Sequence, residues 1–489
     1  MEILFVSPEV VPYSKVGGLG DVVGALPKAL RALGHKVTVL SLRYGSIDPA
    51  EHALARRLTK VKVKLAGEEV SCEVYEARLP SGVTVVLLGG PRVSDRPGVY
   101  GERATPYDDN ALRFGLLCQG AVSWMRAQTK VPDLVHLHDW TTAIIPALLR
   151  QGAVDDPRLA KVRTVLTVHN LAHQGNLSLE DGRAVGLDAA SLARMEFFGR
   201  ASWLKAGLLE ADRVTTVSPT YAREIVTAAG GAGMDGVLRA HAKGLTGILN
   251  GIDPGVWNPS TDPHLAARYD VFDPLPKARC KTALQQELGL PVRPETPIAG
   301  LVARIDAQKG IDLLLGCATQ LLRQDVQLVV QGSGDPALEA SLAALAKELP
   351  EKVAYRSAYD DRLAHRIYAG SDLFLVPSRF EPSGLTQLYA MRYGTVPVVR
   401  WTGGLRDTVL DCDPTLATGT GFVFESLLPE DFYGAIARGL AAYQQTDRFA
   451  TLRRRVMRID HAWDRSARRY GAVYRELVPD AEDGPSATA

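Results

Sequence analysis

Residues 15–21 combine a cation with glycines in a pattern suited to binding phosphate. They read KVGGLGD and lie between a strand-like run at 3–6 and a helix-like run at 22–33. Glycines let the backbone approach a ligand closely, and the first turn of a helix has unpaired N–H groups that attract anions. The spacing is neither G-x-G-x-x-G nor a P-loop. The lysine therefore indicates a sugar diphosphate rather than a dinucleotide, whose pyrophosphate usually rests on backbone and helix dipole.

A second cationic segment, RIDAQKG at residues 304–310, follows an apolar run at 298–302. The pattern predicts a strand at 298–302 and a helix at 310–322, which places Arg304 and Lys309 near the start of that helix. Two cations beside the positive end of a helix dipole suit a departing nucleoside diphosphate. From these residues alone, a solvated basic turn is the alternative.

Residues 379–386, RFEPSGLT, are predicted to connect a strand at 373–376 with a helix at 387–392. The carboxylate of Glu381 and a run of backbone amides at such a junction can hold sugar hydroxyls and phosphate together. A capping turn explains the same residues equally well without the other segments.

Histidines follow or occupy two predicted strands of the first half. Residues 136–140 read HLHDW and residues 167–170 read TVHN. Two histidines on one face of a strand with an aspartate at its end could ligate zinc. A zinc protease motif is excluded because Asn170 stands where H-E-x-x-H needs glutamate. The D-x-D pattern at 411–413 lies in a proline-containing loop and is interpreted as a turn.

Taken together, these blocks resemble the bacterial glycogen synthases and plant starch synthases over roughly residues 1–475. The family has K-x-G-G-L, R-x-x-x-x-K-G and E-P-C-G-L-T-Q, which correspond here to residues 15–19, 304–310 and 381–387. Ser383 replaces the usual cysteine of the third block, and His173 stands where the family commonly has an aromatic residue. The resemblance implies an α/β GT-B glycosyltransferase fold, with two Rossmann-like doubly wound domains facing across a cleft.

The resemblance also implies an activity. A relative of these enzymes would move glucose from ADP-glucose to the non-reducing end of an α-1,4-glucan with retention of configuration, releasing ADP. No metal or other cofactor is expected, and the expected partners are ADP-glucose and the glucan, without nucleic acid or membrane. The alternatives are a transferase that uses UDP- or GDP-sugars and a non-catalytic glucan-binding protein. A dehydrogenase would need G-x-G-x-x-G and an acidic residue about 20 positions later.

Site residues follow from the resemblance position by position. Arg304 and Lys309 are expected to contact the diphosphate, and Glu381 the donor glucose. His169 is expected to lie beside the anomeric carbon, and Tyr359 to stack on the base. Asp139 and Trp140 are expected to face the acceptor. The residues expected to be catalytic are His169, Glu381, Arg304, Lys309 and Asp139. Those expected to bind substrate are Lys15, Gly17, Gly18, Asp21, Trp140, Asn170, Asn250, Tyr359, Ser383, Gly384, Leu385 and Thr386.

Length and periodicity predict the organisation of the chain. A length of 489 residues exceeds one ordinary core, and two series of alternating strands and helices indicate two parallel α/β domains. Expected strands lie at 36–40, 83–88, 134–138, 165–169 and 213–218, and then at 298–302, 326–330, 353–355, 373–376 and 396–399. The expected parts are domains at 1–255 and 279–460, a crossover at 256–278, a helix at 461–478 that crosses back, and a disordered tail at 479–489.

Composition excludes several classes of protein. The 56 Lys and Arg residues against 55 Asp and Glu give a net charge of +1, which favours neither nucleic acid nor an anionic membrane. The five cysteines are scattered without a C-x-x-C pair, which argues against disulfide frameworks and zinc ribbons. No apolar run reaches the ~18–20 residues of a membrane span, and the chain begins with a strand rather than a leader. A cytoplasmic enzyme is expected.

Overall fold

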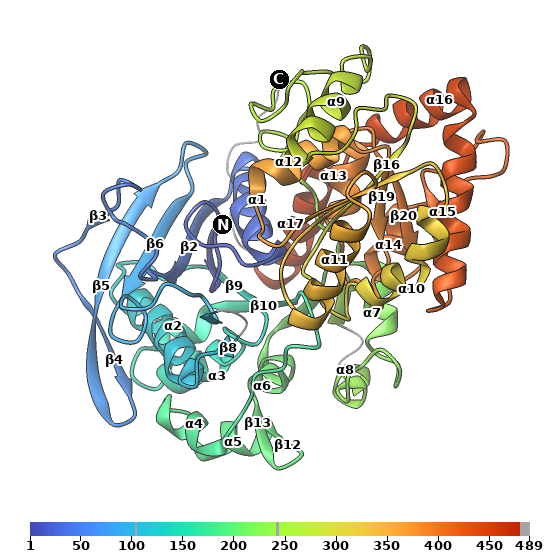
Figure 1. Cartoon of the computed structure of the whole chain (residues 1–489). Helices are drawn as coiled ribbons and strands as arrows, with labels where there is room; N and C mark the ends of the chain where they lie inside the picture. The colour runs from blue at the N-terminus through green and yellow to red at the C-terminus, as the bar shows by residue number, and fades with distance from the viewer. Residues whose placement is uncertain (103–104, 241–243, 480–489) are drawn as a thin grey trace. The chain divides into compact units, whose positions relative to one another are not determined.

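The structure, a computed structural model, describes residues 1–102, 105–240 and 244–479. It divides into two compact units (Figure 1). Unit 1 contains residues 1–250 and the segment from Trp463 onward, and unit 2 contains residues 251–462. The tail that was expected to be disordered lies, from residue 480, outside the described residues. The domain boundaries expected from the sequence stay a prediction, because compactness alone does not say which segments fold or move together.

Unit 1 is built on a ten-stranded sheet whose order is β15-β14-β10-β9-β1-β2-β6-β5-β3, with β4 paired to β5. From β15 to β6 the strands are parallel, and their apolar runs are buried on both faces, as in a doubly wound fold. These strands are β1 (Glu2–Val6), β2 (Lys36–Leu42), β6 (Thr84–Gly89), β9 (Leu134–His138), β10 (Arg163–Val168), β14 (Arg213–Thr216) and β15 (Leu245–Gly247).

One edge of this sheet is antiparallel, which the sequence analysis did not anticipate. The added strands are β3 (Ala55–Arg56), β4 (Val61–Leu65) and β5 (Glu68–Arg78). Valines and lysines alternate along β4, and the burial alternates with them, so this hairpin has one face in water. The described residues of unit 1 also form five short strands: β7 (Gly101–Glu102), β8 (Thr105–Pro106), β11 (Asn176–Leu177), β12 (Glu196–Phe197) and β13 (Arg200–Ser202).

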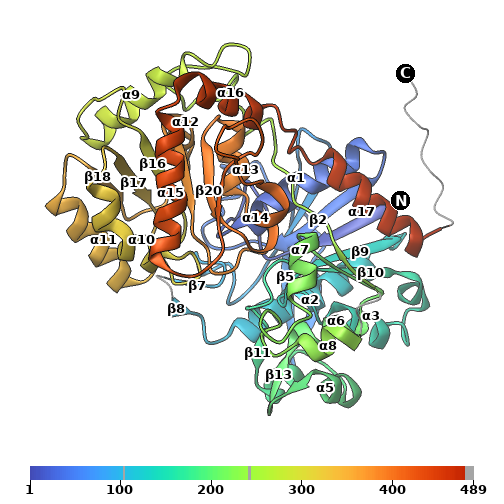
Figure 2. The same cartoon turned by 90° about the vertical axis from the view of Figure 1, so that its right-hand side faces the viewer.

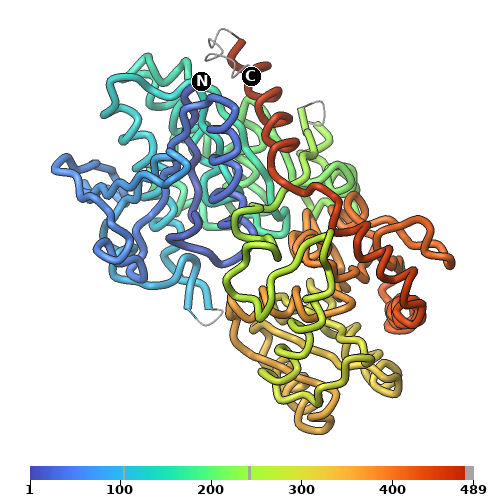
Figure 3. The backbone as a smooth tube through the Cα atoms, turned by 90° about the horizontal axis from the view of Figure 1, so that it is seen from above, coloured from blue at the N-terminus to red at the C-terminus, as the bar shows by residue number. Residues whose placement is uncertain are grey.

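The C-terminal helix α17 (Asp464–Leu477) belongs to unit 1 and packs against α1 (Gly18–Ala32), as Figure 3 shows. Its Tyr470 and Tyr474 are fully buried in the core of unit 1. The other helices of unit 1 are α2 (Asn110–Arg126), α3 (Ile145–Gly152), η1 (Pro157–Lys161), α4 (Leu179–Ala184), α5 (Ala189–Met195), α6 (Trp203–Glu210), α7 (Pro219–Glu224) and α8 (Asp235–Ala240).

Unit 2 contains a six-stranded parallel sheet in the order β18-β17-β16-β19-β20-β21. Numbered from its own first strand, this is the 3-2-1-4-5-6 order of the Rossmann fold. The order reverses between β16 and β19, which are neighbours in the sheet. The strands are β16 (Ile298–Val302), β17 (Gln327–Gln331), β18 (Val353–Arg356), β19 (Leu373–Val376), β20 (Val396–Arg400) and β21 (Phe422–Phe424).

Helices cover the sheet of unit 2, and in Figure 2 α15 lies across it at β20 with α16 beside it. Trp257, near the start of unit 2, is part of the core of that unit. Its ring stacks on those of His365 and Tyr389, with a centroid distance of 3.9 Å in both cases. The helices are α9 (Lys277–Leu288), α10 (Ile311–Leu322), α11 (Pro336–Glu348), α12 (Asp361–Gly370), α13 (Thr386–Arg392), α14 (Gly403–Thr408), α15 (Pro429–Tyr443) and α16 (Thr446–Met457).

Candidate active site

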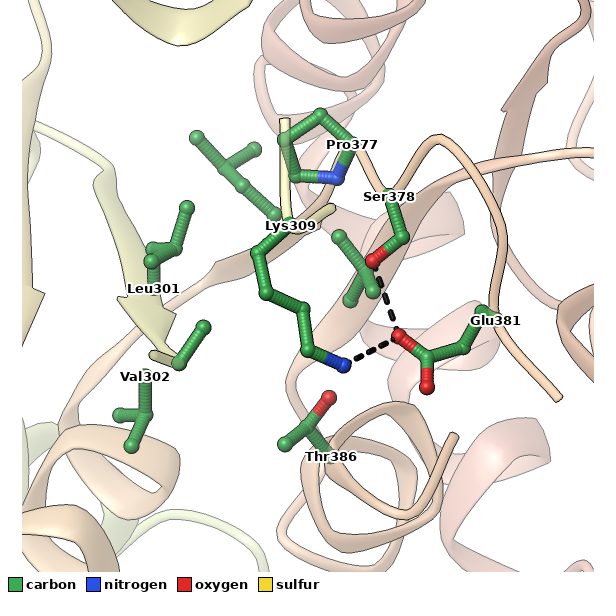
Figure 4. Close-up of a pocket in the computed structure, with 10 residues that line it drawn as sticks. Leu301, Val302, Lys309, Pro377, Ser378, Glu381 and Thr386 are labelled. Atoms are coloured by element: carbon green, nitrogen blue, oxygen red, sulfur yellow. Dashed lines mark hydrogen bonds and ion pairs between the residues drawn. The ribbon is translucent and has the colours of Figure 1, made fainter. Parts of the chain in front are cut away.

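In unit 2, the loops that follow β16 and β19 meet in a small pocket. The ends of the two strands line it together with Lys309, Ser378, Glu381 and Thr386 (Figure 4). The Lys309 ammonium donates to Glu381 Oε2 at 2.6 Å, and the Ser378 hydroxyl donates to the same oxygen at 2.9 Å. This pocket lies at the carboxyl ends of the strands where the order reverses, the place where open α/β sheets bind ligands.

The loop after β16 is fixed by its own side chains. Asp306 accepts the backbone N–H of Lys309 at 2.9 Å and forms an ion pair with Arg304 at 3.2 Å. Arg304 also donates to Gln308 at 2.9 Å, and about half of its side chain is exposed. Gly310 has φ +69°, and an added Cβ would lie 2.0 Å from the carbonyl oxygen of Pro377. Glycine is thus required where this loop touches the loop after β19.

The turn that carries Glu381 is braced from behind by Gln387, a residue that the sequence analysis did not single out. Its amide nitrogen donates to the carbonyl oxygen of Gly384 at 2.8 Å and to Thr408 at 3.1 Å. Gly384 has φ +66°, and the N–H of Gly404 donates to the carbonyl oxygen of Glu381 at 3.0 Å. The four residues expected to bind substrate here, Ser383 to Thr386, therefore lie on a backbone that is held on both sides.

Two further expected residues lie apart from that turn. Tyr359 precedes α12 and is half exposed, and its hydroxyl donates to Asp361 at 2.8 Å. Asn250 ends the first segment of unit 1, and its buried Oδ1 accepts no hydrogen bond from a described residue.

The glycine loop of unit 1 is organised by Glu9, a buried carboxylate that the sequence analysis missed. Glu9 Oε2 accepts the backbone N–H groups of Val16 and Gly17 at 2.7 and 3.1 Å, and Tyr100 donates to Oε1 at 2.8 Å. Burial raises the pKa of Glu9, although these hydrogen bonds act against the shift. The N–H of Gly17, expected to face a ligand, is thus engaged within the protein.

The other residues of this loop have different surroundings. Lys15 forms an ion pair with Asp21 at 2.9 Å, and Gly18 begins α1. A Cβ added at Gly17 would meet no atom within 4 Å. Packing therefore does not require glycine at position 17. Because glycine has no side chain, the space beside this residue stays unfilled.

Asp139 joins the carboxyl ends of β9 and β10. Its Oδ1 accepts the backbone N–H of His169 at 2.7 Å and of Asn170 at 3.4 Å, and its own backbone has φ +56°. Burial raises the pKa of Asp139 to about 7. The next residue, Trp140, meets Phe114 edge to face with ring centroids 5.1 Å apart. The sheet therefore brings Asp139, Trp140, His169 and Asn170 together.

Three histidines lie close together, two of them within β9 and the third just after β10. His136 is held between the Tyr474 hydroxyl at 2.7 Å and the Thr167 hydroxyl at 2.6 Å, whereas His138 Nδ1 lies 2.9 Å from His169 Nε2. Burial lowers the pKa of all three rings, that of His169 to about 3. The imidazoles are therefore neutral at physiological pH.

The histidines and the D-x-D pattern at 411–413 are the candidate metal ligands of this chain. Within the part of the chain that the structure describes, no group of three or more His, Cys, Asp or Glu side chains is arranged to hold a metal ion. Asp413 instead accepts hydrogen bonds from Thr415 and Thr418, and Asp411 pairs with Arg438, so these residues form a structured turn.

Among the residues that the structure describes, no helix is both long enough and apolar enough to cross a membrane.

Comparison with known proteins gives the family. The starch synthase catalytic domain family matches residues 2–240, and the glycosyl transferases group 1 family matches residues 286–454. A glycogen synthase of Anaeromyxobacter dehalogenans is 49% identical over 482 residues, which are 98% of this chain and 100% of that protein. The chain belongs to the glycogen synthase family. It is a glycosyltransferase with the two-domain GT-B fold, as the sequence analysis predicted.

Other relatives agree with this membership. Glycogen synthase 2 of Geobacter sulfurreducens is 40% identical over 486 residues, covering 99% of this chain and 100% of that protein. Among solved structures, the catalytic domain of starch synthase IV from Arabidopsis thaliana bound to ADP and acarbose has a TM-score of 0.91 and 34% identity, covering 98% of this chain and 99% of that one. Every expected site residue except Asn250 falls within the two matched regions of this glycogen synthase family member.

Proposed function

We propose that this glycogen synthase family member transfers glucose from ADP-glucose to the non-reducing end of an α-1,4-glucan, with retention of configuration and release of ADP. The observation that carries the proposal is the Lys309–Glu381 pair at the switch point of unit 2. It joins a cation suited to phosphate to a carboxylate suited to sugar hydroxyls. The ADP bound to the Arabidopsis starch synthase supports the choice of nucleotide. We also propose that the enzyme is cytoplasmic.

On the donor side, we assign the diphosphate to Arg304 and Lys309 and the glucose hydroxyls to Glu381. The backbone from Ser383 to Thr386 would hold the remaining polar groups of the donor, and Tyr359 would stack on the base. The ring of Tyr359 is half exposed and its hydroxyl donates to Asp361, and an aromatic ring in this position suits stacking on a base.

In unit 1, we assign Lys15, Gly17, Gly18 and Asp21 to the phosphate and ribose end of the donor. His169 and Asn170 would lie beside the reacting sugar, and Asp139 and Trp140 would bind the acceptor. The buried Oδ1 of Asn250 accepts no hydrogen bond from any residue that the structure describes, which supports a role in accepting one from substrate. These assignments follow the contacts above and the positions of the family's motifs.

The chemistry follows from where charge develops. The bond between glucose C1 and the phosphate oxygen breaks, and its electron pair leaves with ADP. The acceptor O4 forms a bond to C1 on the same face and gives its proton to the departing phosphate oxygen. Fixed cations stabilise the negative charge on the leaving phosphate more strongly than they stabilise the substrate, because they are already oriented. Lys309 and Arg304 would provide this charge in place of a bound divalent metal.

A donor panel tests the proposal. Nucleoside diphosphate release from ADP-, UDP- and GDP-glucose is measured with glycogen as acceptor and without it. We expect ADP-glucose to have the highest kcat/KM and release to require glycogen. Equal use of UDP-glucose would refute the nucleotide assignment, and binding of glycogen without turnover of any donor would favour a glucan-binding protein.

A further inference from the structure

Two buried histidine rings meet at the carboxyl ends of β9 and β10. His138 Nδ1 and His169 Nε2 are 2.9 Å apart, with ring centroids separated by 5.2 Å. Burial lowers the pKa of both imidazoles and keeps them neutral, and a positive charge on His169 would lower the pKa of His138 further. A neutral imidazole has one N–H donor and one bare acceptor nitrogen. One ring must therefore donate to the other, and the direction decides where the proton of His169 lies.

The surroundings of His138 decide that direction. Its Nε2 is buried and has no hydrogen-bond partner among the described residues. Its ring neighbours include Phe5, stacked with its centroid 5.4 Å away, and His136, with its centroid 4.4 Å away. Both nitrogens of His136 are already engaged by Tyr474 and Thr167, so neither can serve His138.

A proton on His138 Nε2 would therefore be a buried N–H without an acceptor. Burying a bare nitrogen at this position costs less free energy than burying an unpaired N–H. The favourable arrangement puts the proton of His138 on Nδ1, from which it is donated to His169 Nε2. Because His169 Nε2 is then an acceptor, the neutral ring of His169 must carry its own proton on Nδ1.

His169 Nδ1 points to a different environment from Nε2. It has no hydrogen bond to a described residue, yet it is not among the polar atoms that are sealed from water. The backbone N–H of His169 is meanwhile tied to Asp139 at 2.7 Å, so the ring is held at both its root and its inner edge. Nδ1 is thus the N–H donor of a ring that is held in place.

We propose that His138 is a positioning residue that holds His169 as the Nδ1–H tautomer, so that His169 donates a hydrogen bond to a substrate oxygen and does not act as a base. The role toward substrate rests on the proposed function, whereas the tautomer does not. Orienting partners of functional histidines commonly change activity or ligand affinity by about 10–100-fold when they are removed, as seen at metal sites.

The tautomer can be measured directly. The protein is labelled with ¹⁵N-histidine, and long-range proton–nitrogen spectra at pH 7 distinguish protonated from bare ring nitrogens. The signals of His169 are identified by their loss in His169→Gln. We expect the wild-type protein to carry the proton of His169 on Nδ1, and we expect His138→Phe, which keeps a ring but cannot donate, to move it toward Nε2. His138→Asn, whose amide can donate from the place of Nδ1, is the matched control and should keep the wild-type tautomer.

Activity provides the second readout. With ADP-glucose and glycogen, kcat of His138→Phe should fall about 10–100-fold while the KM for ADP-glucose changes less, and His138→Asn should recover most of the loss. A wild-type proton on His169 Nε2, a positively charged His169 at pH 7, or an unchanged tautomer in His138→Phe would overturn the proposal. If His138→Phe does not fold, the wild-type spectrum still decides the tautomer. If the wild-type protein has no transferase activity, the proposed function fails while the tautomer assignment is tested separately.

Discussion

Lys309 and Glu381 form an ion pair of 2.6 Å although 72 positions separate them in the chain. The pair exists because β16 and β19, which precede the two loops, are adjacent in the sheet. Glu381 shares its oxygen Oε2 between Lys309 and Ser378, so the carboxylate has a fixed orientation. A group that binds sugar hydroxyls and a group that binds phosphate thus set each other's positions.

Removal of Lys309 is expected to slow catalysis severely. Loss of one preoriented donor at a charge-developing site typically costs about 10²–10³ in kcat, or roughly 3–4 kcal/mol. Steady-state kinetics of Lys309→Ala should show this loss, with a melting temperature close to that of the wild type. Lys347→Ala, an exposed lysine of α11, is the control and should be fully active.

The same pair predicts strong coupling between its members. Because Lys309 orients Glu381, the double variant Lys309→Ala/Glu381→Ala should be little slower than the worse single variant. Strictly multiplicative losses in kcat would show that the two residues act independently. A large fall in the melting temperature of Glu381→Ala would instead give that carboxylate a structural role.

Asp139 is expected to cause a pH dependence near neutrality. Its pKa is raised to about 7 by burial, so the carboxylate is lost as the pH falls below that value. If the ionised form accepts a hydrogen bond from the acceptor hydroxyl, kcat/KM for glycogen should rise with pH through about 7. Asp139→Asn keeps the shape and tolerates φ +56°, and its profile should be low and flat in that range. An unchanged rise in Asp139→Asn would assign the titration to another group.

Glu9→Gln is expected to change stability with a definite sign. The pKa of Glu9 is raised in the folded protein, so the unfolded chain loses its proton first as the pH rises above 4.5. Wild-type stability from this group is therefore present at low pH and is lost as the pH rises through the folded pKa. The melting temperature of Glu9→Gln minus that of the wild type should increase between pH 4.5 and pH 8. A constant difference would mean that Glu9 titrates normally.

Catalysis is expected to continue without a divalent metal. Activity is measured after exhaustive dialysis against EDTA and again after addition of Mg²⁺ or Mn²⁺. We expect no loss and no stimulation, because Arg304 and Lys309 are proposed to stabilise the leaving phosphate. If activity vanished and metal restored it, His136, His138, Asp411 and Asp413 would return as candidate ligands.

Much of the fold could be predicted from the sequence, and the reason differs between elements. Strands β9, β16 and β19 coincide with their predicted ranges because each is a short apolar run, buried on both faces. The hairpin of β4 and β5 was not predicted. Alternating Val and Lys residues form a half-exposed strand there, and such a strand contains no continuous apolar run. Helix α1 begins at Gly18, four residues before its predicted start, because helix propensity argues against the glycines of its first turn.

The site could be predicted only as separate residues. Lys309 and Glu381 each stood in a recognisable block, but their contact depends on the order of strands in the sheet, which no local pattern contains. Glu9 and Gln387 carry no local signal, since a single Glu before a loop and a Gln on a helix are ordinary residues. His138 was noticed only as a possible metal ligand, and its bond to His169 becomes visible once β9 and β10 are paired.

The return of α17 to unit 1 has a consequence for synthesis on the ribosome. Tyr474 fills the core of unit 1 and binds His136, yet residues 251–462 of unit 2 emerge before it. The first 250 residues must therefore wait for their last helix, which ends at Leu477. At roughly 5–20 residues per second, the 477 − 250 = 227 intervening residues take about 11–45 s to make. During that interval, the nascent sheet leaves the surface that α17 later covers open to chaperones.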